Sequence, residues 1–453
     1  MTAAGGLFFP QSKSLGIDQG ETSPALLAKI TYAGTASRSF AEASALLQQL
    51  ADLPVPEKQV ERLTRRIGAE RVDERDAAVA AFAALPVVEK FASPAGVTAP
   101  EVAVVMADGG RLQIRGEPGA GVAPPEPATA SGAALGAVAR GDEAWEEEAA
   151  ANARAGHWRE DKVGLLLTMT SEVADRDPCP EIPASFLDVV RIPKLVRALK
   201  KHVQEGADAV ADTEEPEAPA AALQAEATYQ PPVVAQRQVL ASRQTWPTFA
   251  PLLAQAAWAL GFQGAARKAF VADGSANNWK LQRRFFGSFV AVLDFIHVLS
   301  YVFAAAMAGR RFAAGWASYQ QWIGWVWQGR VAEVIAALEA RQAELGRPQE
   351  DEPETNPRRL VDRTLTYLRN HRDKMRYDEY RRQGLPISSS HVESVVKQIN
   401  QRVKGTEKFW SEEGSEAVLQ LRADYLTDGQ PLQAFWQRRQ AAATGQRRYR
   451  HVG

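Results

Sequence analysis

Three carboxylates that lie far apart in the sequence carry the most distinctive chemistry of this chain. Asp108 and Asp273 each follow an apolar run and precede a glycine, in Val-Val-Met-Ala-Asp-Gly and Ala-Phe-Val-Ala-Asp-Gly. This pattern predicts two buried strands, each ending at a carboxylate that is released into a turn. Glu393 follows Ser-Ser-Ser-His-Val near the start of an amphipathic helix. Two strand-end aspartates and one helical glutamate can converge on one metal site.

Cleavage of a phosphodiester bond needs metal ions held by hard oxygen ligands, commonly two ions roughly 4 Å apart. Carboxylates at strand ends suit this task because the strands fix their positions. The three acids meet the requirement if residues 101–115, 158–170 and 266–273 share one sheet. An Asp-Gly pair taken singly is more typical of a turn. Together the acids favour a nucleic-acid-cutting enzyme with all three as metal ligands.

The composition is that of an ordinary globular protein. The 453 residues suffice for two or three domains, and the formal net charge is −1. Acidic residues gather in two low-complexity segments, near 116–156 and 204–228, which we interpret as flexible insertions. The single cysteine, Cys179, excludes an internal disulfide framework or a cysteine-rich zinc site. The lack of a signal peptide and of an apolar run of roughly 18 residues predicts a soluble cytoplasmic protein with no membrane partner.

Residues 23–90 have a helical pattern with one clear interruption. A helix over 40–50 is followed by the break Asp52-Leu-Pro-Val-Pro56 and then by a second helix. Helix, tight break and helix resemble a helix-turn-helix, and Arg62 and Arg65 on the second helix are candidate DNA contacts. An ordinary helical hairpin with a solvated basic face is the alternative.

Strands and helices alternate through much of the remaining chain, which is typical of an α/β core. From Trp279 to Arg382 the pattern is almost wholly helical, so a helical block is expected between the second and third acids. The other expected elements are two short strands around Gly109-Gly110 within 101–115, a strand over 158–170, helices over 184–202 and 246–260, and a strand over 266–273.

These motifs resemble those of the DDE transposases of bacterial insertion sequences, particularly the Mutator-like group. The group also has a Cys/Asp-x-x-His signature after its second Asp, and this chain has Asp294-Phe-Ile-His297. Relatives often carry a cysteine-containing zinc ribbon near the N-terminus, which has no counterpart here, so the resemblance says less about DNA-end recognition than about catalysis. Three stretches carry the resemblance, which covers about residues 15–440: Val104-Val-Met-Ala-Asp-Gly-Gly-Arg, Phe270-Val-Ala-Asp-Gly-Ser and Leu385-Pro-Ile-Ser-Ser-Ser-His-Val-Glu-Ser-Val-Val-Lys-Gln-Ile.

The resemblance implies a ribonuclease H-like catalytic core with a large all-helical insertion and an N-terminal helical, helix-turn-helix-like domain. It implies that Asp108, Asp273 and Glu393 are the catalytic metal ligands. It also implies that Asp294 and His297 are accessory catalytic residues on one helical face. His297 would then position an acid or touch the scissile phosphate, and helix packing is its alternative role.

The segment that begins at Glu393 can also be interpreted from its residues alone. Its valines and isoleucine repeat at helical spacing, whereas Glu393, Lys397 and Lys404 follow another face. This face could track a phosphate backbone, and a solvated amphipathic helix is the alternative. Trp410 follows, in a segment that resembles one common after the glutamate of these enzymes, and it either stacks on a base or packs.

The expected activity is that of a DDE transposase, which cleaves element-end DNA and joins it to target DNA with two Mg²⁺ ions, Mn²⁺ being able to substitute. Its expected partners are double-stranded DNA, as terminal inverted repeats and target, and further copies of the chain in a homodimer or higher oligomer on DNA at the bacterial nucleoid. The alternatives are a ribonuclease H-like nuclease or resolvase without strand transfer, and a non-catalytic domesticated DNA-binding derivative. The expected domains are an N-terminal helical DNA-binding region (1–90), the first part of the core (91–299), the helical insertion (300–385), the completion of the core (386–430) and a basic tail (431–453).

Overall fold

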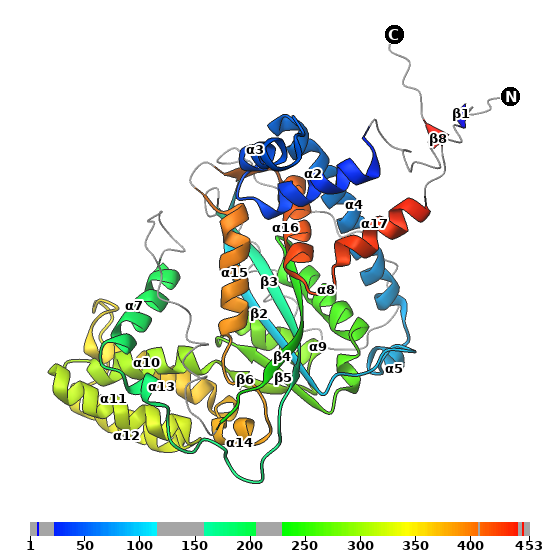
Figure 1. Cartoon of the computed structure of the whole chain (residues 1–453). Coiled ribbons are helices and arrows are strands. Elements are labelled where there is room, and N and C mark those ends of the chain that lie inside the picture. Colours follow the sequence, from blue (N-terminus) through cyan, green and yellow to red (C-terminus); the bar gives the residue numbers. More distant parts are fainter. Residues whose placement is uncertain are drawn as a thin grey trace.

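The computed structural model describes residues 7–8, 22–115, 158–204, 229–405, 408–442 and 446–447. Both predicted flexible insertions lie outside these residues, except for Gln204 at the end of a helix. The predicted basic tail, residues 431–453, is described as far as residue 442 and at residues 446–447. The described residues form a mixed α/β structure around a six-stranded sheet (Figure 1), so the expected α/β class is confirmed.

The central sheet combines an antiparallel half with a parallel half. Its strands are β2 (Val102–Ile114), β3 (Trp158–Thr170), β4 (Val233–Ser242), β5 (Arg267–Ala272), β6 (Val290–Leu293) and β7 (Phe409–Trp410). They lie in the order β4-β3-β2-β5-β6, with β7 beside the end of β2. β2, β3 and β4 pair antiparallel, whereas β5 is parallel to β2 and β6 is parallel to β5. The three segments expected to share a sheet therefore do so. A separate two-stranded sheet pairs β1 (Leu7–Phe8) with β8 (Gln446–Arg447).

The register of the sheet brings Asp108 and Asp273 level with each other. Met106 of β2 is opposite Val271 of the parallel strand β5. Two residues further along each chain, the two aspartates follow in the same register. Neighbouring strands lie about 4.8 Å apart, so Asp108 and Asp273, which directly follows the end of β5, are close enough for their charges to interact.

β2 is one continuous strand, so the prediction of two short strands around Gly109-Gly110 is wrong. Asp108, Gly109 and Gly110 all remain paired with β3. Asp108 therefore lies within a strand and not at a strand end. A Cβ at Gly110 would lie 2.8 Å from the carboxylate oxygens of Asp161 on β3. Glycine is needed there because another side chain approaches closely, and not because the chain turns.

The helical block predicted over 279–382 is interrupted by β6, so this prediction is partly wrong. Residues Val290–Leu293 pair in parallel with β5. The run Val-Ala-Val-Leu is short, apolar and rich in valine, which suits a buried strand. Pairing with the sheet therefore outweighs the apparent helical spacing of the apolar residues around it.

Three N-terminal helices precede the sheet, and a proline-containing break separates the second from the third, as predicted. Ser23 and Ser39 cap the first two helices by accepting backbone N–H hydrogen bonds. The third helix is 28 residues long and packs against α16 (Glu412–Leu426), where Arg71 pairs with Asp424 at 2.8 Å. This is the helix predicted after the break, and it is longer than expected and anchored to the core through α16. The three are α2 (Pro24–Ala36), α3 (Phe40–Ala51) and α4 (Glu57–Ala84).

Different helices cover the two faces of the sheet. α15 (Ser390–Val403) lies along β2 and β3 (Figure 1), and the predicted helix over 246–260 is confirmed as α8 (Trp246–Ala259). α8 approaches β3 so closely that a Cβ at Gly164 would lie 2.6 Å from Cδ1 of Leu253. Asp108 is opposite Val163, the neighbour of Gly164, and therefore leaves the other face. The site thus lies on the face that α15 covers.

Helices α7, α10, α11, α12 and α13 lie together at one end of the molecule, and α2 and α3 lie at the other (Figure 1). The helix predicted over 184–202 is divided into a 3₁₀ turn, Ala184–Leu187, and α7. Within the described ranges, no helix has both the length and the apolar character needed to cross a membrane. The further helices are α5 (Val87–Lys90), α7 (Arg191–Gln204), α9 (Ala276–Phe285), α10 (Phe295–Met307), α11 (Phe312–Trp327), α12 (Val331–Leu345), α13 (Pro357–Asn370), α14 (Tyr377–Arg382) and α17 (Pro431–Ala441).

Candidate functional site

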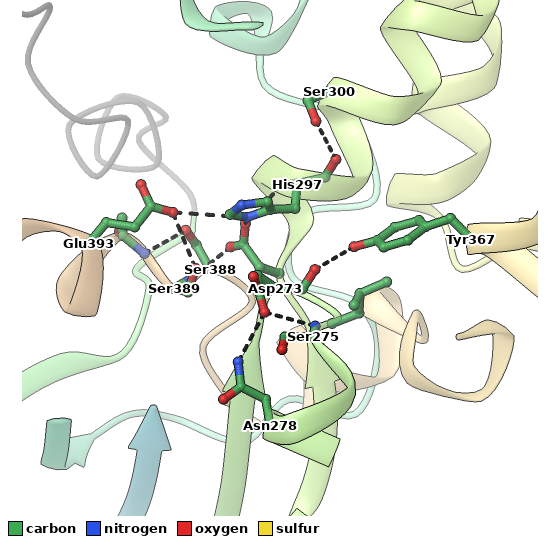
Figure 2. Close-up of polar contacts among 12 residues, drawn as sticks. Asp273, Ser275, Asn278, His297, Ser300, Tyr367, Ser388, Ser389 and Glu393 are labelled. Carbon is green, nitrogen blue, oxygen red and sulfur yellow. Dashed lines mark hydrogen bonds and ion pairs between the residues drawn. The ribbon is translucent and has the colours of Figure 1, made fainter. Parts of the chain in front are cut away.

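Asp108 and Asp273 each use one carboxylate oxygen for local hydrogen bonds. Oδ1 of Asp108 accepts the backbone N–H of Gly109 at 2.7 Å. Oδ1 of Asp273 accepts the backbone N–H of Ser275 at 2.9 Å and the side-chain amide of Asn278 at 3.0 Å (Figure 2). Among the described residues, none donates a hydrogen bond to Oδ2 of either aspartate. Each aspartate is therefore held in place and still has one oxygen available.

Asp294 and His297 form a hydrogen-bonded pair at the start of α10. Asp294 is the N-cap residue, and its Oδ2 accepts both the backbone N–H of His297 at 2.8 Å and a hydrogen bond with Nδ1 of the imidazole at 2.7 Å. The backbone N–H of Asp294 donates to the carbonyl of Ala272 at 2.8 Å, directly before Asp273. Helix capping and sheet pairing thus place this pair beside the second aspartate.

Glu393 reaches the same place from α15. The segment before this helix is fixed to the start of α10, because the N–H of Ser389 donates to Oδ1 of Asp294 at 2.7 Å. Oε1 of Glu393 lies 3.3 Å from Oγ of Ser389 and 4.0 Å from Nδ1 of His297. Figure 2 shows Glu393 beside the imidazole of His297 and Asp273 below it.

The charges of these residues act strongly on one another. Burial and the neighbouring charge of Asp273 raise the pKa of Asp108 to about 7. Burial and the charge of Asp294 raise the pKa of Glu393. Burial alone would lower the pKa of His297, but its hydrogen bond to Asp294 and the surrounding acids raise it to about 10. The site therefore holds a histidine cation at neutral pH and still carries more acids than this cation can balance.

Among the described residues, one group is close enough together to share a metal ion. Asp294, His297 and Glu393 have ligand atoms within 4.8 Å of one another. However, Asp294 and His297 already satisfy each other, so a cation would have to break their hydrogen bond. Asp108, Asp273 and Glu393, the predicted ligands, are not grouped this closely among the described residues, but their carboxylate oxygens are the hard, anionic ligands that suit Mg²⁺ or Mn²⁺. We therefore keep these three as the candidate ligands and regard Asp294 and His297 as their neighbours.

Tyr367 of α13 touches the site, although no local pattern in the sequence singles it out. Its hydroxyl donates to the backbone carbonyl of Asp273 at 2.8 Å (Figure 2), and its ring stacks on Tyr301 with 4.0 Å between centroids. Gly274 has a φ of +103°, and a Cβ there would lie 2.8 Å from the Tyr367 ring. The tyrosine thus holds the turn that carries Asp273. The contact joins residues 94 positions apart, so no local pattern could indicate it.

Asp161 is a further buried carboxylate near the site that the sequence reasoning missed. It is 0% exposed, and no described residue donates a hydrogen bond to either of its carboxylate oxygens. Burial raises its pKa to about 7, although its own backbone N–H and Lys162 oppose the shift. The sequence feature that could have indicated this carboxylate is an acidic residue at the start of the apolar run that forms β3.

Trp410 is a packing residue, so the alternative in which it stacks on a base is wrong. It is only 4% exposed, and its indole N–H donates to the carbonyl of Val403 at 2.8 Å. Its ring lies edge-on to Phe40, with 6.2 Å between centroids. A buried ring with a satisfied N–H has no open face for a base.

The two arginines predicted to contact DNA differ in their surroundings on α4. Arg62 is exposed. Arg65 pairs with Glu61 at 2.6 Å, and its guanidinium carbon lies 5.8 Å from the centre of the Trp410 ring. Arg62 is therefore open to a partner, whereas Arg65 contributes to packing between α4 and β7.

The two lysines predicted to contact DNA lie on α15 and at its end. Lys397 is half-buried, and its positive charge acts on Glu393, which places it close to the acids. Lys404 is exposed, with its ammonium nitrogen 5.8 Å from the centre of the Trp158 ring. One lysine thus adjoins the site, and the other lies at the far end of the helix.

Comparisons with known proteins add no family assignment. Neither a protein-family model nor a curated protein matches the chain. The function must therefore be argued from the geometry of the site.

Proposed function

We propose that this chain is a metal-dependent DNA transposase of the DDE type with a ribonuclease H-like core. The observation that supports the proposal most strongly is the arrangement of the three acids. Asp108 on β2 and the residue after β5, Asp273, are close enough for their charges to interact, and Glu393 approaches them from α15. The sheet, an antiparallel half continued by two parallel strands, supports a core of this kind.

Each residue has a task that follows from its surroundings. The available oxygens of Asp108, Asp273 and Glu393 would hold divalent metal ions, which activate the attacking oxygen and stabilise the leaving oxygen when bound. His297, held as a cation by Asp294, lies 4.0 Å from Glu393 and would fix the orientation of that carboxylate. It would also offset part of the charge of an approaching phosphate.

The central test is DNA cleavage by variants that keep side-chain size but weaken cation ligation. The substrate is a supercoiled plasmid that carries the DNA flanking this gene on both sides, with Mg²⁺ or Mn²⁺ present. Asp108→Asn, Asp273→Asn and Glu393→Gln should each abolish cleavage and weaken metal binding in calorimetry, while circular dichroism stays unchanged. Asp373→Asn is the matched control, because this acid is exposed outside the candidate ligand set. Cleavage that survives in any of the three variants at the wild-type rate would remove that residue from the proposed ligand set.

Strand transfer separates a transposase from a nuclease on the same site. A second, unlabelled plasmid in the reaction would serve as the target. Joined products support the transposase, since the released 3′-hydroxyl must attack the target by in-line displacement. Cleaved ends without any joined product, under all metal conditions, would reduce the proposal to a nuclease.

A further inference from the structure

A pocket with a volume of about 230 Å³ lies between the N-terminal helices and the C-terminal end of α15. Its charged wall consists of Arg38, Arg402 and Arg422, with Glu42 as its carboxylate. Arg402 is nine residues after Glu393 on α15, which corresponds to about 14 Å along a helix. The pocket is therefore separate from the acids of the candidate active site.

The three arginines have no carboxylate partner among the described residues. The guanidinium of Arg402 donates to the carbonyls of Gly34 and Arg38 at 3.1 and 3.3 Å. That of Arg422 donates to backbone carbonyls as well, including those at the end of α2 at 3.2 Å. The carboxylate of Glu42 accepts the backbone N–H of Arg38 at 2.6 Å. Among the described residues, the acceptors of the two buried guanidinium groups are thus all neutral backbone carbonyls.

The charges lining the pocket do not balance. Three arginines contribute about +3, whereas Glu42 contributes about −1 and the C-terminal end of α2 contributes about −0.5 through the helix dipole. Burial and the charge of Arg422 lower the pKa of Arg402 to about 10, and burial lowers the pKa of Arg422. Two of these arginines, Arg402 and Arg422, are buried, and buried positive charge is unfavourable unless an anion offsets it.

Two donors at this wall also lack acceptors. Nη2 of Arg402 and Oγ of Ser37 are buried and have no hydrogen-bond partner in the described part of the chain, and the two residues are 2% and 6% exposed. The guanidinium carbon of Arg402 lies 4.2 Å from the centre of the Phe40 ring, which restricts its orientation. A buried, oriented guanidinium with an unused N–H group indicates a missing acceptor. At about 30 Å³ for each water molecule, the pocket has room for a tetrahedral oxyanion and several waters.

We propose that Arg38, Arg402, Arg422 and Ser37 form a binding site for a phosphate group. Guanidinium groups suit phosphate because their N–H groups match its oxygens in pairs. The phosphate group comes either from the backbone of DNA or from a free phosphate or nucleotide. The site joins α2, the turn before α3, α15 and α16, so its occupation would stiffen the contact between the N-terminal helices and the helix that carries Glu393.

Thermal unfolding of the full chain in inorganic phosphate tests the site directly. At saturating phosphate, Tm should rise by about 2 °C or more relative to chloride at equal ionic strength. Arg38→Gln should lose this rise, and because Arg38 is exposed, the variant should still fold. Arg330→Gln, in an exposed pair with Glu333, is the matched control and should keep the rise. A rise in Tm of the same size in all three proteins would reflect the general stabilisation of folded proteins by phosphate and would overturn the proposal. The absence of any rise in the wild-type protein would overturn it as well.

DNA binding by the same proteins then identifies the source of the phosphate. If Arg38→Gln lowers affinity for a DNA duplex at least fivefold and inorganic phosphate competes with that duplex, the site takes a backbone phosphate. If duplex affinity is unchanged while the phosphate stabilisation is lost, the site takes a free phosphate or nucleotide. Neither measurement involves DNA cleavage, so the phosphate site and the proposed transposase activity can fail independently.

Discussion

Replacing Asp161 with asparagine should stabilise the protein above neutral pH and leave its stability nearly unchanged in acid. Asp161 is 0% exposed, no described residue donates a hydrogen bond to either of its carboxylate oxygens, and its pKa is about 7. An unfolded aspartate has a pKa of about 3.9, so the folded protein binds this proton more tightly than the unfolded chain does. The wild-type free energy of unfolding therefore falls as pH rises from about 4 to about 7.

The size of the effect follows from the difference between the two pKa values. A difference of about 3, at about 1.4 kcal/mol for each pKa unit, gives about 4 kcal/mol as an upper bound. Asparagine is neutral at every pH and has nearly the same shape, so it avoids burying the unpaired charge. Asp161→Asn should thus equal wild type near pH 4 and exceed it by up to about 4 kcal/mol near pH 8.5.

Urea unfolding of both proteins at several values between pH 4 and pH 8.5 measures this difference. Asp351→Asn serves as the control, because Asp351 is exposed in the loop before α13 and should show no such trend. A difference between Asp161→Asn and wild type that does not change with pH would refute the reasoning. It would mean that the buried carboxylate is paired or hydrated in the folded protein.

Three further predictions concern the site and its DNA contacts. Tyr367→Phe and Tyr380→Phe each remove a hydroxyl that donates to a backbone carbonyl, at 2.8 and 3.1 Å, so each should lower the free energy of unfolding by about 1 kcal/mol. Only Tyr367→Phe should also slow cleavage, by about tenfold. Equal cleavage rates in the two variants would argue against a positioning role for Tyr367. His297→Ala should slow cleavage at least tenfold per folded molecule and keep metal binding, so normal cleavage alongside a lowered Tm would make the histidine a packing residue. Neutralising Lys397 and Lys404 together should reduce the slope of log K against log salt by about 1.8 for duplex DNA, and an unchanged slope would favour a solvated helical face.

Much of the sheet could be predicted from the sequence because buried strands leave clear apolar runs. The strand over 158–170 and the strand before Asp273 were found with correct bounds or nearly so. β4 was missed, since only the second half of Val233–Ser242 is buried and Gln236, Arg237 and Gln238 interrupt its apolar residues. β6 was missed because four residues are too few to show a period of two, and only pairing with β5 reveals it.

The candidate site shows where local patterns lose their information. Asp108 was assigned to a strand end because Asp-Gly-Gly is typical of a turn, but the pairing of β2 with β3 continues through the glycines. The packing of Trp410 against Phe40 and the hydroxyl contact of Tyr367 both depend on residues distant in the sequence. Such contacts arise only when elements assemble, and one sequence contains no local signal for them.

The connection between β6 and α15 leaves the sheet and returns to it at nearly the same point. The N–H of Phe295 donates to the carbonyl of Ile387 at 3.0 Å, and Asp294 binds the N–H of Ser389 at 2.7 Å, so the path from α10 to α14 is closed at its base. Segments whose two ends are adjacent can be lengthened or exchanged with little effect on the structure that holds them. Loops within this connection can therefore change the sequence spacing between Asp273 and Glu393, while two hydrogen bonds, one between backbone groups and one to the Asp294 carboxylate, fix where the connection leaves and rejoins the sheet.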